Sequence, residues 1–283
     1  MASLEKSIVL PVHDSAELNK SRLDLLTIPV NIAAQVLKRI IIIAALLGLW
    51  EVAPRIGLVE QAFLPSFSVV LASWWQLLLS GDLWDHTQAS LVRSFAGFGL
   101  ALVIAIPLGL LIGWYKRLSD LLNPLLELFR NTAALALLPM FVLILGIGET
   151  SKIALVVYAC SFPILINTIS AVRYVDPLLI KSAKSMGLSP FRLFQKVILP
   201  AAVPPIFTGI RMAGASSILV LVAAEMVGAK AGLGYLINYA QFSFMVPEMY
   251  AGIITISALG LLVNHILVSL ERYFTAWKPS STE

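Results

Sequence analysis

A few ionisable side chains of this 283-residue chain stand inside or at the edge of long apolar runs. The clearest are Arg93, Arg130, Arg211 and Glu225. An ionisable side chain is costly to place in hydrocarbon, so such residues are candidates for a functional role. A guanidinium can hold a planar or trigonal oxyanion through two parallel donors. The arginines are therefore candidates for contact with an anion.

Each of these residues also has a structural interpretation. Arg93 opens an apolar run, so its side chain could extend to lipid headgroups, and this interpretation is favoured. Glu127 precedes Arg130 by one helical turn, so the two could form an ion pair. For Arg130 the functional and structural interpretations are equally open. Arg211 could pair with Glu225 or with backbone carbonyls, but about 21 Å of helix separates the two residues, which disfavours a direct pair.

The composition indicates a protein that lies in a bilayer. Hydrophobic residues make up 59% of the chain and charged residues only 13%, whereas soluble domains carry about 25% charged residues. The mean hydropathy is +0.89. The net charge of +4 could suggest nucleic acid, but the placement of the basic residues favours membrane orientation instead. The single cysteine, Cys160, lies in an apolar run as a small hydrophobe, which excludes a disulfide framework and a thiolate metal site.

The apolar runs predict an all-α polytopic membrane protein with six transmembrane helices. A helix needs about 20 mainly apolar residues to cross the hydrocarbon. Basic residues accumulate on the cytoplasmic side, and only Arg55, Lys152 and Lys230 fall in the segments assigned to the outside. Both termini are therefore predicted to be cytoplasmic. The expected spans lie at 38–54, 91–114, 121–147, 153–171, 205–227 and 250–270.

The longest cytoplasmic loop lies between the fourth and fifth spans. Asp176 can cap a helix that begins at Pro177, and Gly187 can end that helix in a left-handed conformation. A second helical piece is expected to start at Ser189 and to be stopped by Pro200. The loop is unusually apolar, which favours either an amphipathic helix on the bilayer or docking of a cytoplasmic partner. Its apolar residues are Leu178, Leu179, Ile180, Met186, Leu188, Phe191, Leu193 and Phe194.

Residues 181–200, KSAKSMGLSPFRLFQKVILP, resemble the coupling-loop motif of type I ATP-binding-cassette importer permeases. That motif reads Glu-Ala-Ala, three residues, Gly, nine residues, then an aliphatic residue, any residue and Leu-Pro. Lys181 and Ser182 replace the first two residues here, while the spacing from Gly to Leu-Pro is kept. In the family, this loop inserts a short helix into a groove of the ATPase subunit. The resemblance implies ATPase-coupling roles for Lys181, Ser182, Ala183, Met186, Gly187, Leu188, Leu199 and Pro200.

A wider resemblance covers residues 60–272 and concerns permeases for sulfonate, nitrate, bicarbonate and taurine. It is carried by FLPSFSVV (63–70), SLVRSFAGFGLALVIAIPLGLLIGW (90–114), LFRNTAALALLP (128–139), LGIGETSKI (145–153), FPILINTISAVRYVD (162–176) and LVAAEMVGAKAGLGYLI (221–237). The 129–139 stretch is most similar to the aliphatic-sulfonate branch. The resemblance implies alternating-access import of a small oxyanion, most closely an aliphatic sulfonate, with nitrate, bicarbonate or taurine as alternatives. Arg130, Arg211 and Glu225 are then the candidate anion path.

The same resemblance divides the chain and implies its partners. Residues 1–37 form a cytoplasmic tail in which 15–27 could be an amphipathic helix, 38–85 the first span and a periplasmic interfacial segment, 86–272 the transmembrane domain and 273–283 a second tail. The implied partners are cytoplasmic ATPase subunits that bind ATP and Mg, a periplasmic or lipid-anchored substrate-binding protein, and a second permease copy. The chain itself then needs no cofactor, lies in the bacterial inner membrane and binds no nucleic acid.

Two rival classes fit the sequence less well. A membrane enzyme would need a histidine cluster, paired carboxylates or a nucleophile motif, but His13, His86 and His265 lie far apart and neither H-E-x-x-H nor G-x-S-x-G occurs. A secondary anion transporter usually places carboxylates within the membrane, and only Glu127 and Glu225 qualify. Neither class explains the coupling-loop pattern.

Glycines indicate two local features. Gly109 and Gly113 are spaced for close packing of two helices. GAKAGLGYLI at 228–237 reads as a glycine-rich turn before a short helix. It lacks the Gly-Lys-Ser/Thr ending of a nucleotide-binding loop.

Overall fold

The computed structural model describes residues 37, 38 and 40–276, and every regular element in that part of the chain is helical. The predicted helix at 15–27, nearly all of the tail 1–37 and most of the tail 273–283 lie outside the described residues. The chain forms two compact units that divide between Phe67 and Ser68. This division precedes the domain boundary predicted after residue 85, because the segment from 68 onward packs with the second unit.

The described part of the first unit is built around a helix over residues 40–55, which overlaps the first expected span at 38–54. The indole Nε1 of Trp50 donates a hydrogen bond to the carbonyl of Pro65 at 3.1 Å. The ring of Trp50 also lies 5.5 Å from that of Phe67. These contacts fold the segment after the helix back onto its end.

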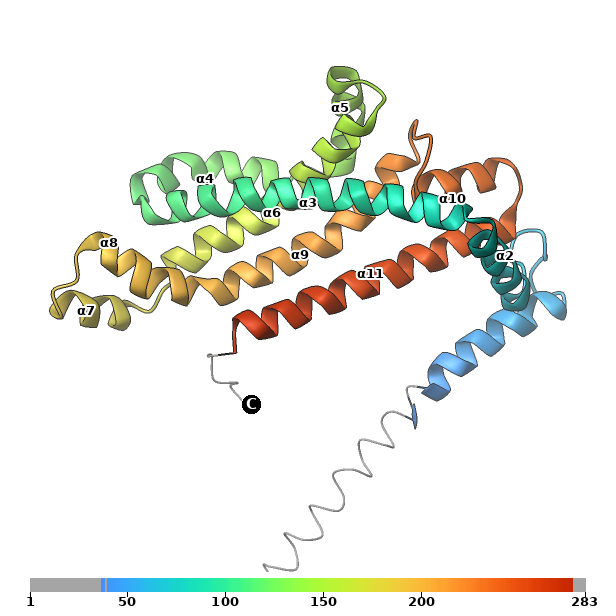
Figure 1. Cartoon of the computed structure of the whole chain (residues 1–283), viewed down its shortest axis with the longest axis horizontal. Coiled ribbons are helices and arrows are strands. Elements are labelled where there is room, and N and C mark those ends of the chain that lie inside the picture. Colours follow the sequence, from blue (N-terminus) through green and yellow to red (C-terminus); the bar gives the residue numbers. More distant parts are fainter. Residues whose placement is uncertain (1–36, 39, 277–283) are drawn as a thin grey trace, which may run out of the picture. The chain divides into compact units, whose positions relative to one another are not determined.

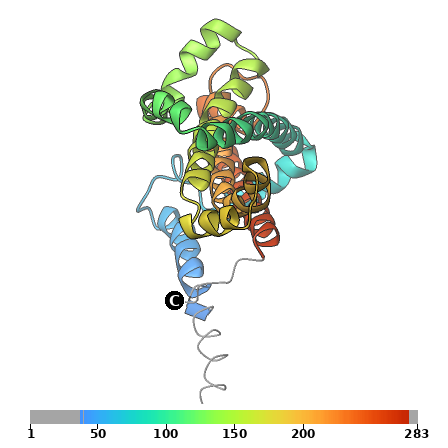
Figure 2. The same cartoon turned by 90° about the vertical axis from the view of Figure 1, so that its left-hand side faces the viewer.

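The second unit is a bundle whose long helices α3, α6, α9 and α11 lie side by side (Figures 1 and 2). The helices α7 and α8 lie at one end of these long helices, and α10 lies at the other (Figure 1). The elements are α2 (Phe67–Ser80), α3 (Asp82–Trp114), α4 (Lys116–Arg130), η1 (Ala134–Leu137), α5 (Leu138–Leu145), α6 (Glu149–Arg173), α7 (Pro177–Ser185), α8 (Pro190–Leu193), η2 (Phe194–Ile198), α9 (Leu199–Glu225), α10 (Leu233–Phe242) and α11 (Val246–Phe274).

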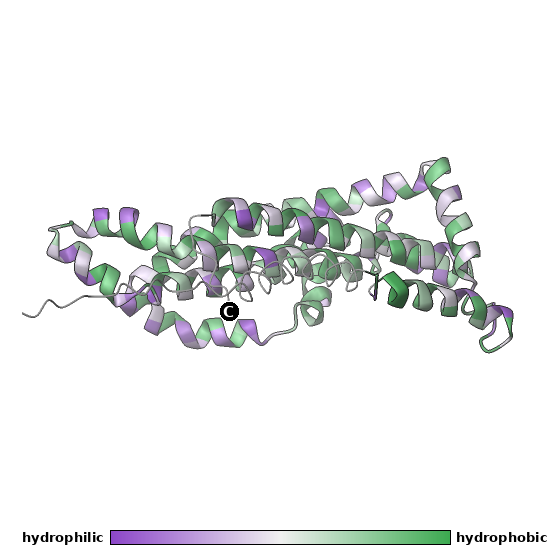
Figure 3. Ribbon diagram, turned by 90° about the horizontal axis from the view of Figure 1, so that it is seen from below, coloured by the Kyte–Doolittle hydropathy of each residue, from purple (hydrophilic) through white to green (hydrophobic). Residues whose placement is uncertain are grey.

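Four helical stretches are long and apolar enough to cross a membrane, and Figure 3 shows the predominance of apolar residues along them. They are Asp82–Trp114, Glu149–Arg173, Pro190–Glu225 and Val246–Phe274. They correspond to the second, fourth, fifth and sixth expected spans. The total of six spans and the direction in which they cross stay predictions.

The third expected span, 121–147, is not one helix. It is broken into α4 and the pair η1–α5, with a bend of 85° between them. The break follows from local chemistry, because Asn131 and Thr132 donate side-chain hydrogen bonds to the carbonyls of Glu127 and Leu128 at the end of α4. Pro139 then stands in the first turn of α5, where its missing N–H costs nothing. The pair forms either a broken span or a re-entrant loop.

Helices α3 and α6 approach each other closely along a row of glycines. A Cβ on Gly109 would lie 2.6 Å from Cβ of Thr168, and one on Gly113 would lie 2.8 Å from Cβ of Val172. The predicted close packing at these two glycines is confirmed. Cys160 is fully buried in the core between α3, α6 and α9, as expected for a small hydrophobe.

The tryptophans near the start of α3 divide into two groups. Trp74 packs in a cluster with Leu83 and Leu233, and its Nε1 donates to Oγ1 of Thr255 on α11 at 3.0 Å. This hydrogen bond joins α2 to α11. Trp75 and Trp84 are exposed.

Candidate functional site

The first half of the loop that is predicted to be cytoplasmic folds as its sequence predicts. Oδ1 of Asp176 accepts a hydrogen bond from the backbone N–H of Leu178 at 2.8 Å, and Pro177 is the first residue of α7. Gly187 has a φ of +75° and ends the helix in the left-handed region. The cap and the glycine elbow are both confirmed. These two predictions succeed because a helix cap and a glycine turn each depend on only a few residues of backbone.

The second half differs from the prediction, because Pro200 does not stop a helix. After α8 the chain passes through the π-helical η2 and continues directly into α9. The N–H of Leu199 donates to the carbonyl of Phe194, five residues earlier. Pro200 then falls in the first turn of α9, and it has no N–H to donate to the preceding turn. Leu199 and Pro200 thus join the loop to the longest helical stretch of the bundle.

The apolar residues of the loop divide between two faces. The inner face packs on the ends of α3, α6 and α9, with Ala183 and Leu193 buried, and the ring of Phe194 lies 5.0 Å from that of Trp114. The side chains of the other apolar residues are exposed by about half to three quarters. These residues, the outer face of the loop, are Leu178, Leu179, Met186 and Phe191. Lys181 and Ser182 are exposed beside them, whereas Leu188 is half-buried.

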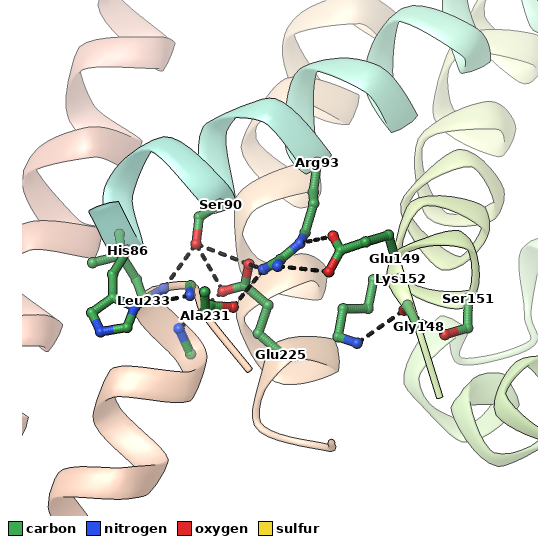
Figure 4. A network of polar contacts seen from close by, with 12 residues as sticks. His86, Ser90, Arg93, Gly148, Glu149, Ser151, Lys152, Glu225, Ala231 and Leu233 are labelled. Atoms are coloured by element: carbon green, nitrogen blue, oxygen red, sulfur yellow. Dashed lines mark hydrogen bonds and ion pairs between the residues drawn. The ribbon is translucent and has the colours of Figure 1, made fainter. Parts of the chain in front are cut away.

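A buried ionic cluster lies at the opposite end of α9 (Figure 4). We name it the Arg93 cluster, and its members are Ser90, Arg93, Glu149 and Glu225. The guanidinium of Arg93 donates through Nε and one terminal nitrogen to Glu149. Its other terminal nitrogen donates to Glu225 at 2.6 Å and to the carbonyl of Ala231 at 2.7 Å. The cluster therefore ties α3, α6, α9 and the segment before α10 together.

Glu225 is the most enclosed member of the cluster, with 1% of the residue exposed. Besides Arg93, its carboxylate accepts from the hydroxyl of Ser90 and from the backbone N–H of Gly234 at 3.0 Å. Gly234 stands in the first turn of α10, so the carboxylate also meets the positive end of that helix. A Cβ on Gly232 would lie 2.4 Å from the Glu225 carboxyl, and one on Gly234 would lie 2.2 Å from a backbone oxygen. The predicted glycine-rich turn is confirmed, and it encloses a carboxylate of the chain itself.

The sequence interpretation of Arg93 was wrong. The side chain does not extend outward but is 6% exposed and paired with two carboxylates. Its partners lie 56 and 132 residues further along the chain, so no local sequence pattern predicts these two ion pairs. A buried arginine needs compensating charge, but nothing in the sequence indicates which glutamate supplies it.

The three candidates for an anion path have separate surroundings. Glu225 lies in the Arg93 cluster, and Arg211 pairs with Glu271 of α11 at 3.1 Å instead of with Glu225. Arg130 is exposed and forms no hydrogen bond or ion pair within the described part of the chain, so the suggested pair with Glu127 is not formed. Arg130 also lines two pockets. Contact of any of the three with an anion stays a prediction.

The sequence profile of one family, described as binding-protein-dependent transport system inner membrane component, matches residues 105–277. The chain belongs to this family. It is a permease subunit of an ATP-binding-cassette importer and not an enzyme, as the coupling-loop resemblance implied. Among the described residues of this permease, no group of His, Cys, Asp and Glu side chains is placed to hold a metal ion.

The permease is similar to named proteins over most of its length. It is 34% identical to the protein named as an aliphatic sulfonates transport permease, SsuC, of Bacillus subtilis, over 86% of this chain and 88% of that protein. It is 33% identical to the taurine transport system permease protein TauC of Escherichia coli, over 83% of this chain and 87% of that protein.

Solved structures share the fold. The inward-facing MetNI methionine ABC transporter matches with a TM-score of 0.60 at 22% identity, over 70% of this chain and 96% of that chain. An all-helical fold of this kind, with several apolar helices, makes the permease a multi-pass membrane protein.

Proposed function

We propose that this permease imports an aliphatic sulfonate across the bacterial inner membrane by alternating access, with both of its termini in the cytoplasm. Support comes from the names of the two relatives. Taurine is itself an aminoalkyl sulfonate, so the substrates in both names carry the same charged head group. Taurine is the second candidate on the same observation. Nitrate and bicarbonate, and a secondary anion transporter, are weaker alternatives.

The outer face of the loop carries this proposal. Leu178, Leu179, Met186 and Phe191 are largely exposed at the end of the bundle, on a loop whose other apolar residues are packed. Exposed apolar side chains grouped in this way suit a protein partner. The partner that fits is an ATPase subunit that receives α7 in a groove and binds ATP and Mg, so the permease itself carries no cofactor.

Helix α9 offers a path for the motion. It runs without interruption from the loop, at Leu199, to Glu225 in the Arg93 cluster, a length of about 40 Å. A displacement of the loop by the closing ATPase would therefore move both ends of the same helix. Because Glu225 accepts a hydrogen bond from Gly234 in the first turn of α10, the displacement reaches the end of the bundle that is predicted to face the periplasm.

The remaining partners complete the importer. A second permease copy would pair with this one over two ATPase subunits. A periplasmic or lipid-anchored binding protein would deliver the anion to the outer mouth. The surrounding lipid contacts the exposed apolar residues of the long helices, such as Val103 and Leu261.

Uptake in liposomes tests the proposal. The permease, its ATPase and its binding protein are reconstituted, and uptake of labelled butanesulfonate is compared with that of taurine, nitrate and bicarbonate. ATP-dependent uptake of the sulfonate in preference to the inorganic anions is expected. Preferred uptake of nitrate or bicarbonate would reject the substrate, and uptake that does not need ATP would favour a secondary transporter.

A further inference from the structure

A groove of about 420 Å³ lies beside Arg130, between α4, α6 and α9. One part of its wall is aromatic and consists of Phe129, Tyr158 and Phe162, whose ring centroids lie 5.0 to 6.5 Å apart. The hydroxyl of Tyr158 is bonded to the carbonyl of Phe129, which holds its ring in the wall. The groove thus combines an apolar surface with one guanidinium.

The hydrogen-bond donors that line this groove differ in whether they already have a partner within the chain. The side chains of Thr132, Asn167 and Ser216 also line it, but each donates a hydrogen bond to the backbone carbonyl four residues earlier in the chain. The side chain of Arg130 makes no hydrogen bond or ion pair with the described residues, so its N–H donors are available to a ligand. An anion that enters the groove would therefore meet Arg130 first.

A second, smaller pocket of about 190 Å³ shares Arg130 and Ile166 with the groove. It also contains Arg173, but that guanidinium already donates to Ser119 and pairs with Asp120. The two pockets follow the same side of α6 toward the end at which the chain enters the coupling loop. Arg130 therefore lies between the groove, which has an aromatic wall, and the smaller pocket, which is more polar.

We propose that the groove holds the cargo in transit, and that the cargo is an organic oxyanion. Its charged head lies on Arg130, and its apolar tail lies on Phe129, Tyr158 and Phe162. This inference rests on the importer function proposed above. An inorganic anion such as nitrate would leave the aromatic wall without a partner and would lose hydration against it, whereas an alkyl chain is favoured there. The volume of the groove also lies in the range of small-molecule sites.

Equilibrium binding tests the site directly. The complex of permease and ATPase is placed in lipid nanodiscs without ATP or binding protein, and labelled butanesulfonate is titrated and competed with methanesulfonate. In the Arg130→Gln variant we expect binding of both sulfonates to weaken by at least about tenfold, since a charged donor is lost. Arg130→Lys is expected to restore part of the affinity. Arg117→Gln, on the same helix and outside both pockets, serves as the matched control.

The aromatic wall is tested through chain length. In Phe162→Ala we expect butanesulfonate to bind about tenfold more weakly and methanesulfonate to bind nearly as before, because only the longer chain reaches the wall. Equal losses for the two anions in Phe162→Ala, or no loss of affinity in either Arg130→Gln or Phe162→Ala, would overturn the inference. If the wild type still performs ATP-dependent sulfonate uptake in that case, the proposed function stands without the site. If it performs none, the proposed function has failed as well.

Discussion

Arg93 holds two carboxylates at once, one fully buried and one largely exposed. The two are not equivalent. Glu225 has no access to water and depends on Arg93, Ser90 and Gly234 for every bond that it accepts, whereas water can compensate for the loss of Glu149. The stability of this end of α9 therefore depends mainly on the pair of Arg93 and Glu225.

Replacement of Glu225 by glutamine should destabilise the permease strongly. The substitution keeps the shape of the side chain but removes the charge that compensates Arg93, and it turns one acceptor into a donor facing donors. A loss of about 3–5 kcal/mol in unfolding free energy is expected, as for a broken buried ion pair. Thermal unfolding of the purified permease in detergent measures this loss.

The same substitution at Glu271 is the control. Glu271 pairs with Arg211, whose side chain is 41% exposed, so water can replace the lost contact. A change below about 1 kcal/mol is expected. Equal losses for Glu225→Gln and Glu271→Gln would mean that the Arg93 cluster has no special role in stability.

Two glycine substitutions should have opposite signs. Gly234→Ala places a Cβ 2.2 Å from the carbonyl oxygen of Val222, so the segment over Glu225 has to move, and a loss of about 1–3 kcal/mol is expected. Gly99 lies inside α3 with open space around it, so Gly99→Ala should raise stability by up to about 1 kcal/mol. Unfolding temperatures of the two variants provide the comparison. A stabilised Gly234→Ala would show that the turn does not need to lie so close to α9.

At the scale of whole elements, sequence reasoning succeeded where the signal is short. The cap at Asp176, the elbow at Gly187 and the glycine row on α3 depend on a few neighbouring residues or on one helix face, and all three could be predicted. The break after Arg130 and the continuation past Pro200 could not. The break depends on side-chain hydrogen bonds to carbonyls at the end of α4, and the continuation depends on a π-helical backbone turn before Pro200. A pattern of apolar residues reports neither kind of hydrogen bond.

The elbow between α7 and α8 should tolerate asparagine but not valine at position 187. Gly187 has a positive φ and no atoms near the place of a Cβ, so only backbone conformation limits the substitution. Asparagine visits this region readily, whereas a β-branched residue does not. Gly187→Asn should therefore keep most ATP-dependent uptake and Gly187→Val should lose most of it. Equal uptake by both variants would argue against a role for the elbow in coupling.

At the scale of the whole molecule, the long helices place the two chemically distinct regions at opposite ends of the bundle (Figure 1). Apolar runs predicted most of these helices, because a bilayer demands them. The pairing of Arg93 with Glu149 and Glu225 could not be predicted, since it requires three helices distant in sequence to be packed first. The cap and the glycine turn of the loop could therefore be predicted from the sequence, and the Arg93 cluster could not.

One measurement tests the central claim, that the outer face of the loop couples ATP hydrolysis to transport. ATP hydrolysis and butanesulfonate uptake are measured together in liposomes for the wild type and for Met186→Asp, which places a charge on that face while Met186 itself is 73% exposed. The variant should fold and insert normally, with an unchanged unfolding temperature, yet lose most uptake and most copurification of the ATPase. Uptake and ATPase association equal to those of the wild type would contradict the account.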